Sequence, residues 1–210
     1  MVVEHDMAQI YPPSAEELAQ LLPETDCGDC GFKSCTEFAS ALLGRNVQAN
    51  VCGHVEDEFA RVLASMMELN TDPIPYNIMM DQHPCTLLEI NGPDKASPLL
   101  VTSNFTETVR IMKEILECSG TSAFLLPTFT HGYSVDNAIP ERMFKAMEIW
   151  KAMKDNAVEQ RLERPVIIIP GLAESEKTSI KQLTRCDVMV GPVSGFLAPL
   201  FILANREEFL

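Results

Sequence analysis

The chain has 210 residues, of which 46% are hydrophobic and 22% charged, a composition typical of a soluble globular protein with one large domain or two small ones. Its formal net charge is −14, and residues 1–70 hold twelve acidic and three basic side chains, which disfavours partners that carry phosphate, such as nucleic acids and anionic lipids. Because no apolar run approaches the roughly 20 residues that span a bilayer and no signal peptide is recognisable, we expect a cytoplasmic protein that is not inserted into a membrane.

The first seventy residues carry three helical patterns around a loop rich in cysteine and glycine. Residues 14–22 have the apolar spacing of a short helix that Pro23 ends. Ser34 and Glu37 fit the capping box of a second helix over residues 35–43, because a serine side chain can accept from the amide three residues later. Residues 54–69 form a third, amphipathic pattern. We therefore predict a helical domain over residues 1–70.

Four of the seven cysteines lie in this region with the spacing Cys-x2-Cys-x4-Cys-x16-Cys, at Cys27, Cys30, Cys35 and Cys52. Disulfides are rare in cytosolic proteins, whereas a cubane iron–sulfur cluster needs four thiolates that converge on a small volume. Gly28 and Gly31 let the backbone approach such a cluster, and Cys35 lies in a first helical turn, where free amides favour a thiolate. Zinc, with His54 as a further ligand, is the main alternative, but structural zinc sites usually pair two short knuckles. The spacing favours a [4Fe–4S] cluster held by the four cysteines.

The rest of the chain divides into a linker and a second domain. Residues 71–97 are rich in proline and hold one short strand pattern at residues 86–90, which indicates a linker with some structure of its own. From residue 98 onward, short apolar strands alternate with amphipathic helices, a pattern typical of a parallel sheet covered on both faces. We predict a Rossmann-like α/β domain over residues 98–210, with strands at residues 99–102, 123–126, 166–169 and 187–190, and helices at residues 106–118, 139–153, 174–183 and 196–205.

The loops after these predicted strands carry small and polar residues. In an open α/β sheet, ligands bind beyond the carboxyl ends of the strands, and glycine there lets a large planar ring approach the backbone. The alternative is that these segments are ordinary turns of a stable fold. The candidate binding residues at this edge are Thr102, Ser103, Asn104, Gly171, Leu172, Gly191 and Pro192.

The cysteine-rich segment, residues 22–39, resembles the N-terminal cluster domain of the corrinoid iron–sulfur protein large subunit, the acetyl-CoA decarbonylase/synthase gamma-subunit family. Residues 98–105, residues 131–138 with their Gly-x-Ser-Val pattern, and residues 166–173 with residues 187–192 are similar to the C-terminal corrinoid-binding domain of that family. The resemblance implies that Ser134, Val135 and Asn137 also contact a corrinoid, although Asn137 could instead cap a helix that begins at Pro140. It implies two cofactors, a [4Fe–4S] cluster and a corrinoid held by this chain or carried by a partner.

The sequence departs from this family in two places. The family carries a TIM barrel between the two modules, whereas only residues 71–97 stand there in this chain. Residues 138–143 replace a segment of small side chains, so we expect Glu141, Arg142 and Met143 to narrow the corrinoid site. His131 is the nearest histidine that could serve as an axial ligand, and the family binds its cobalt without a protein histidine.

Two functions follow from the resemblance. In the first, the protein contacts a corrinoid and supports methyl transfer in anaerobic one-carbon metabolism, with the cluster reducing cobalt from Co(II) to Co(I). In the second, it is an oxygen- or redox-sensing accessory protein whose cluster controls docking onto the corrinoid subunit of a methyltransferase complex in a methanogen. The expected partner is thus a corrinoid-dependent methyltransferase or its corrinoid subunit. Since the sequence has no nucleophile–base pair and no phosphate loop, a cofactor-carrying or regulatory role is favoured over an independent enzyme.

Overall fold

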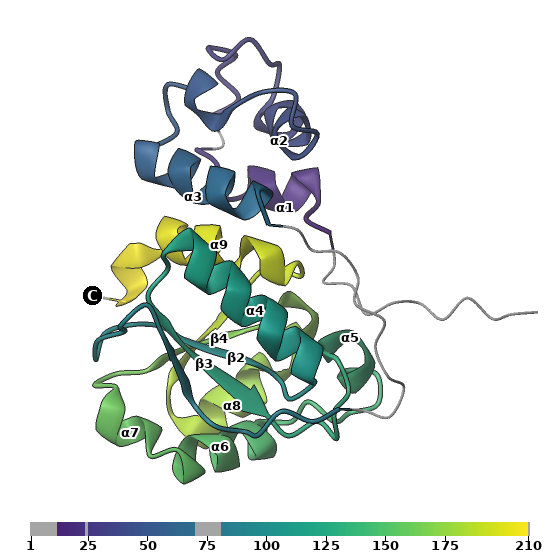
Figure 1. Cartoon of the computed structure of the whole chain (residues 1–210), viewed down its shortest axis with the longest axis vertical. Helices are drawn as coiled ribbons and strands as arrows, with labels where there is room; N and C mark the ends of the chain where they lie inside the picture. The colour runs from purple at the N-terminus through teal and green to yellow at the C-terminus, as the bar shows by residue number, and fades with distance from the viewer. Residues whose placement is uncertain (1–11, 24, 70–80, 210) are drawn as a thin grey trace, which may run out of the picture.

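The computed structural model describes residues 12–23, 25–69 and 81–209, which form a helical unit seated on one side of an α/β sandwich (Figure 1). The cysteine-rich loop belongs to the helical unit. Among the described residues, no helix combines the length and the apolar character needed to cross a bilayer.

The helical unit contains the three predicted helices, which begin and end close to their expected positions. They are α1 (Ala15–Ala19), α2 (Cys35–Leu43) and α3 (Asp57–Met67), with a short 3₁₀ turn, η1 (Ala49–Val51), before the last. The capping prediction is confirmed, because the Ser34 side chain accepts a hydrogen bond of 3.1 Å from the amide of Glu37. The apolar faces of these helices meet in one core built around Leu18, Phe38, Phe59, Val62, Leu63 and Met66.

The second unit is built on a five-stranded sheet within the described residues. Its strands are β1 (Leu88–Ile90), β2 (Leu99–Ser103), β3 (Ala123–Thr128), β4 (Val166–Ile169) and β5 (Asp187–Val190), in the order β1-β3-β2-β4-β5. Strands β2 to β5 are parallel, as predicted, whereas β1 runs antiparallel to β3 at one edge. The strand expected inside the linker is therefore an edge strand of the sheet. The division of the chain at residues 70 and 97 remains a prediction.

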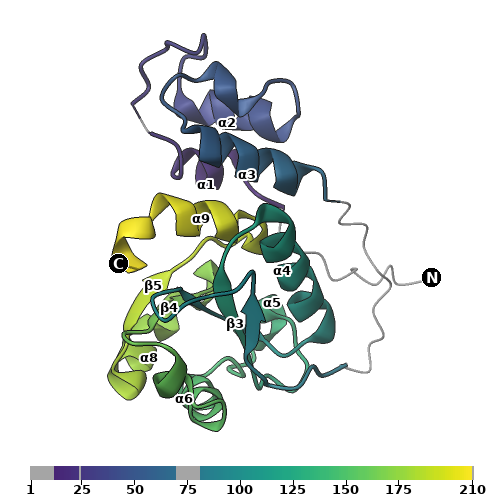
Figure 2. The same cartoon turned by 60° about the vertical axis from the view of Figure 1, so that its left-hand side comes forward.

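Helices cover both faces of the sheet. On one face lie α4 (Thr106–Ser119) and α9 (Ala198–Ala204), and on the other lie α6 (Ala146–Asp155) and α8 (Lys177–Thr184), as Figures 1 and 2 show. The shorter helical segments are α5 (Val135–Ala138), α7 (Val158–Arg161), η2 (Gly171–Glu176), η3 (Gly195–Leu197) and η4 (Arg206–Phe209).

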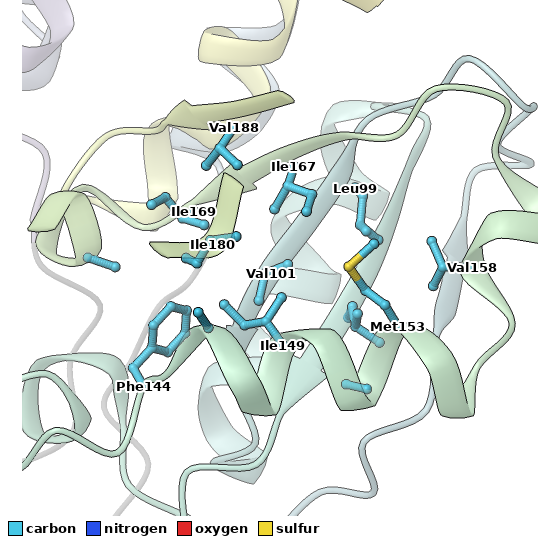
Figure 3. Packing of buried hydrophobic residues seen from close by; sticks show 14 of the residues in the cluster. Leu99, Val101, Phe144, Ile149, Met153, Val158, Ile167, Ile169, Ile180 and Val188 are labelled. Atoms are coloured by element: carbon cyan, nitrogen blue, oxygen red, sulfur yellow. The ribbon is translucent and has the colours of Figure 1, made fainter. Parts of the chain in front are cut away.

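Alternation along the buried strands supplies both cores. Side chains two residues apart point to the same face of a strand. Leu99 and Val101 accordingly join the core under α6 and α8, where Ile167 and Ile169 meet Ile149 and Met153 (Figure 3). The residues between them, such as Leu100 and Ile168, join the core under α4 and α9. Every position of β2 and β3 is buried, and each strand begins with an apolar run, at residues 99–101 and 123–126, and ends on a polar residue.

The single helix predicted over residues 139–153 is wrong. Helix α5 already ends at Ala138, residues 139–145 form a turn, and α6 begins only at Ala146. The intervening turn is closed by a hydrogen bond of 2.8 Å from the Met143 amide to the Ala138 carbonyl, and Arg142 adopts a positive φ of 53°. This turn brings Phe144 into the core, where it is 2% exposed. Burial of one aromatic ring thus accompanies the break in the helix.

Helix α9 lies between the two units. Its Ala198 and Ile202 face the sheet, whereas Leu200, with Leu197 of η3, enters the core of the helical unit. A polar contact joins the units nearby, because the Glu17 carboxylate on α1 accepts from the backbone amide of Val193 at 2.7 Å. The helical unit and the sandwich are therefore in direct contact through both apolar packing and a charged hydrogen bond.

Candidate functional site

The four clustered cysteines line one small pocket at the loop before α2. Its volume is about 300 Å³ including the open mouth, and its other walls come from Leu22, Pro23, Thr25, Asp26, Gly28, Phe32, Ser34 and Phe38. Cys27 is exposed, Cys30 and Cys35 are half-buried, and Cys52 is buried. Although Cys52 lies far along the sequence from the others, η1 returns it to the base of this pocket. The loop thus gathers four thiols around one volume, open to solvent on the Cys27 side.

The loop conformation depends on two glycines and one aspartate. Gly28 and Gly31 have φ of 77° and 86°, a region that side chains disfavour, and the Gly31 amide donates to the Gly28 carbonyl at 2.9 Å. Asp26 Oδ1 accepts from the amide of Cys35 at 2.6 Å. The amide of Cys35 is therefore not free, in contrast to the expectation for a first helical turn. Asp26 instead fixes the position of Cys35, a role that sequence reasoning missed.

The spacing of the sulfur atoms bears on which metal group could fit. Zinc binds thiolates at roughly 2.3 Å, which places two sulfurs on one tetrahedral ion about 3.8 Å apart. Among the described residues, no three of the four cysteine sulfurs lie within 4.8 Å of one another. A cubane cluster binds each thiolate on a different iron and so requires wider separation. The donor set and its spacing fit a cluster better than a single zinc ion.

The remaining cysteines are partly shielded thiols on other elements of the chain: Cys85 and Cys186 are half-buried and Cys118 is exposed. Burial raises the pKa of Cys85, Cys118 and Cys186 above the usual thiol range, and nearby carboxylates such as Glu148 raise the pKa of Cys85 further. Because the thiolate is the metal-binding form, these three side chains are poor ligands at neutral pH. They lie outside the cysteine pocket.

A second and larger pocket lies at the carboxyl ends of the strands. Its volume is about 860 Å³ when the open space at its mouth is included. The chain passes from β2 to β3 on one side and later to β4 on the other, so the carboxyl ends of β2 and β4 flank a topological switch point. Six predicted contacts line the pocket: Thr102, Ser134, Val135, Leu172, Gly191 and Pro192.

Helix α4 forms a wall of this pocket that sequence reasoning missed. Phe105, Thr108, Ile111 and Met112 line it, together with Glu107. Ile111 offered a signal, because it is apolar but stands off the stripe of Val109, Met112, Ile115 and Leu116 that faces the sheet. The lining is mainly apolar, with backbone and a few polar side chains at the mouth.

Four predicted contacts do not line the pocket. Ser103 is fully buried, and Asn137 donates to Ser134 Oγ at 2.8 Å from within α5 rather than capping a helix at Pro140. Asn104 is 2% exposed, and its Oδ1 accepts from the amides of Thr130 and Gly132 and from the Thr130 hydroxyl, at 2.9–3.1 Å. Asn104 therefore joins the ends of β2 and β3.

Replacement of Asn104 by alanine is expected to destabilise the fold. Removing its side chain leaves the amides of Thr130 and Gly132 without their acceptor, whereas the Thr130 hydroxyl can still donate to the Tyr133 carbonyl at 2.9 Å. Each unsatisfied buried group costs about 1–3 kcal/mol. We expect Asn104→Ala to lower the free energy of unfolding by at least that amount in urea denaturation. Asn137→Ala is the control, because Asn137 is exposed, and an equal effect of both variants would contradict the role of Asn104.

Gly171 lacks a side chain at a point where the loops after β4 and β5 pack closely together. A Cβ atom there would lie 2.7 Å from the Val193 amide and 2.9 Å from the Gly191 carbonyl oxygen, both backbone atoms. The close approach allows the Gly171 amide to donate to the Pro192 carbonyl at 3.0 Å. Gly171 thus holds the loop after β4 against the loop after β5, and both loops line the pocket.

The Gly171→Ala variant is expected to separate these two loops. Overpacking of this kind costs about 1–3 kcal/mol, and we expect a loss of that size in the free energy of unfolding. Gly53→Ala is a suitable control, since nothing lies within 4 Å of a Cβ built there. If Gly171→Ala and Gly53→Ala have the same melting temperature, the close backbone contact at Gly171 does not contribute to stability.

The other features expected at the corrinoid site lie apart from the pocket. His131 stacks on Phe129, with ring centroids 4.4 Å apart, and does not line the pocket. None of residues 139–143 lines it either, because the turn after α5 carries them away and Met143 packs on the core under α6. The expected narrowing by Glu141, Arg142 and Met143 is therefore wrong for this pocket.

Comparison with known proteins gives two family matches. The family described as CO dehydrogenase/acetyl-CoA synthase delta subunit matches residues 56–196, and a family described as a putative Fe–S cluster matches residues 22–54.

Curated proteins show the same two parts. The acetyl-CoA decarbonylase/synthase complex subunit gamma of Methanopyrus kandleri is 32% identical over 116 residues, which are 55% of this chain and 25% of that protein. The corrinoid/iron–sulfur protein large subunit of Moorella thermoacetica is 32% identical over 173 residues, 81% of this chain and 36% of that protein. A component of the ion-translocating oxidoreductase complex of Pseudomonas aeruginosa is 34% identical over 62 residues, 30% of this chain and 32% of that protein. The chain thus spans about a quarter to a third of these relatives.

Proposed function

Because the chain belongs to the CO dehydrogenase/acetyl-CoA synthase delta-subunit family and carries the N-terminal iron–sulfur domain of the corrinoid iron–sulfur large subunits, we propose that it is an iron–sulfur protein of anaerobic one-carbon metabolism that contacts a corrinoid. In this proposal a [4Fe–4S] cluster delivers electrons to cobalt and so supports methyl transfer. The observation that carries it is the large pocket at the switch point, which collects six of the ten residues expected to contact the corrinoid.

The cluster would be held by Cys27, Cys30, Cys35 and Cys52. Support comes from their shared pocket and from the separation of their sulfur atoms, no three of which lie within 4.8 Å of one another. When bound, the cluster would supply single electrons at low potential. Exposure of Cys27 would leave one side of it open to an electron donor or acceptor.

The corrinoid would lie at the large pocket. The backbone of Gly191 and Pro192 and the side chains of Leu172 and Val135 offer an apolar surface for a planar ring, while Thr102 and Ser134 offer hydroxyls for its amide side chains. When bound, the corrinoid would supply a reducible cobalt that carries a methyl group. The chain's own part would be to orient this ring and to exclude water from its buried face.

One contact links the helical unit to the wall of the large pocket. Glu17, on α1 of the helical unit, accepts from the amide of Val193, which itself lines the large pocket. The helical unit therefore fixes one wall of the pocket as well as the position of the cysteine loop. This arrangement would keep the distance between the cluster and the corrinoid constant during electron transfer.

Anaerobic titration with cobalamin tests the proposal. We expect the reconstituted chain to show cluster absorbance and to bind cobalamin with a change in the corrin bands. Thr108→Trp should weaken binding roughly tenfold or more, about 1.4 kcal/mol, because the indole would fill the pocket beside α4. Lys113→Trp, on the exposed side of the same helix, should bind as the wild type does. A chain with an intact cluster and no affinity for cobalamin would refute a corrinoid of its own.

A second function is favoured by exposed apolar residues near the pocket. Val193 is 39% exposed and lines the mouth, and Phe129, which follows β3, is 38% exposed. In this alternative the chain docks onto a corrinoid carried by a methyltransferase subunit, and the redox state of the cluster controls docking. Co-purification with that subunit, lost after cluster oxidation or in Cys35→Ser, would support it, and docking that is unchanged in both cases would refute it.

A further inference from the structure

We propose that the cluster-free chain has a second metal site, in which Cys27, Asp29 and His54 bind one divalent transition-metal ion such as Zn²⁺. This set of three donors does not involve Cys30, Cys35 or Cys52. It is the one group of three or more such side chains, among the described residues, whose ligand atoms all lie within 4.8 Å of one another.

The geometry of the three side chains suits a single ion. His54 Nε2 lies 3.1 Å from Asp29 Oδ2, and the Cys27 sulfur lies within 4.8 Å of the ligand atoms of both residues. Zinc binds imidazole nitrogen and carboxylate oxygen at roughly 2.0–2.2 Å and sulfur at about 2.3 Å, so ligand atoms on one ion lie between three and four ångströms apart. Small side-chain rotations would bring the observed group to that arrangement.

The chemistry of the donors agrees with this geometry. Imidazole nitrogen, thiolate sulfur and carboxylate oxygen are all ligands that zinc takes in proteins. All three side chains are exposed, so an ion can enter without unfolding the loop and a water molecule can complete a tetrahedron. Binding of Zn²⁺ would release the Cys27 thiol proton to solvent, with no change in oxidation state.

The second site would compete with cluster assembly. Cys27 is one of the four proposed cluster ligands, so the cluster and the single ion cannot occupy the loop together. Zinc bound at this place would hold Cys27 away from an incoming cluster, whereas a complete cluster would leave Asp29 and His54 without their third partner. The exclusion depends on the proposed cluster ligation, but the affinity of the three-residue set for zinc does not.

Metal titration of the apoprotein tests the inference. Full-length chain, freed of iron and metal under anaerobic reducing conditions, is titrated with Co²⁺ followed optically and with Zn²⁺ in competition with a chelator. We expect one equivalent to bind, with a cobalt–thiolate charge-transfer band that zinc displaces. His54→Ala and Asp29→Ala should each weaken binding at least roughly tenfold, since a tetrahedral site loses one of its three protein ligands.

Cys35→Ser separates this site from the cysteine pocket. Because Cys35 is not a member of the three-residue set, the variant should bind Co²⁺ and Zn²⁺ as the wild type does. In contrast, His54→Ala should accept a cluster in the same iron and sulfide yield as the wild type. If metal binding is lost in Cys35→Ser and unchanged in His54→Ala, the ion occupies the four cysteines and the inference is overturned. Failure of cluster assembly in the wild type, with the metal titration as expected, would refute the proposed function and leave this site intact.

Discussion

Replacement of Cys52 by serine is expected to abolish cluster assembly. Cys52 is the buried member of the cysteine quartet, at the base of the pocket, and its exposed fraction is 7%. A serine hydroxyl of nearly the same size stays protonated at neutral pH and is a weak ligand for iron. After anaerobic reconstitution, we expect iron and sulfide content and visible absorbance to fall to a small fraction of the wild-type values.

Cys118→Ser is the matched control for this change. Cys118 lies on α4, outside the cysteine pocket, and burial raises the pKa of its thiol. We expect the Cys118→Ser chain to assemble a full cluster. Circular dichroism of Cys52→Ser should show the helices retained, so that loss of the cluster is not loss of the fold. Equal cluster content in both variants would remove Cys52 from the proposed ligand set.

The features predicted from sequence are those that short-range patterns encode. The spacing of the cysteines and the Ser34 cap depend on residues near one another in the chain, and both strands β4 and β5 coincide with the apolar runs at residues 166–169 and 187–190. The parallel sheet followed from alternation of strands and helices. The family resemblance, carried by motif order, was confirmed by matches over residues 22–54 and 56–196.

What the sequence could not supply depends on contacts between distant segments. The break between α5 and α6 reflects burial of Phe144, and the apolar spacing of residues 139–153 does not reveal which aromatic side chain the core will accept. Polar residues at strand ends could equally face a ligand or the interior. Asn104 faces the interior because it binds Thr130 and Gly132 across the neighbouring strand.

The packing of the helical unit on the sandwich was also not predicted from the sequence, although the composition of the last helix indicated it. Residues 196–205 were predicted as a final apolar helix, and a helix that is apolar on all sides is buried on all sides. Helix α9 meets this rule, because Ala198 and Ile202 face the sheet while Leu200 faces the helical unit. The composition of this helix therefore implied a second layer above it.

Leu200→Ala is expected to destabilise both units at once. Leu200 is fully buried in the core that α9 shares with the helical unit, and truncation of a buried leucine costs about 2–5 kcal/mol through lost burial and the cavity left behind. Two probes report the two units. Trp150, the single tryptophan of the chain, lies on α6 at the far face of the sheet, whereas cluster absorbance reports the helical unit. In denaturant, we expect both transitions to move to lower concentration together.

Leu203→Ala is the control within the same helix, because Leu203 is only partly buried and its truncation leaves a smaller cavity. Its effect should be clearly below that of Leu200→Ala. If Leu200→Ala shifts the cluster transition while the Trp150 transition keeps its wild-type midpoint, the units unfold independently and the shared core does not couple them. Coincident shifts would mean instead that the helical unit and the sandwich unfold as one cooperative structure, which would hold the cysteine loop and the pocket wall near Val193 in a fixed arrangement.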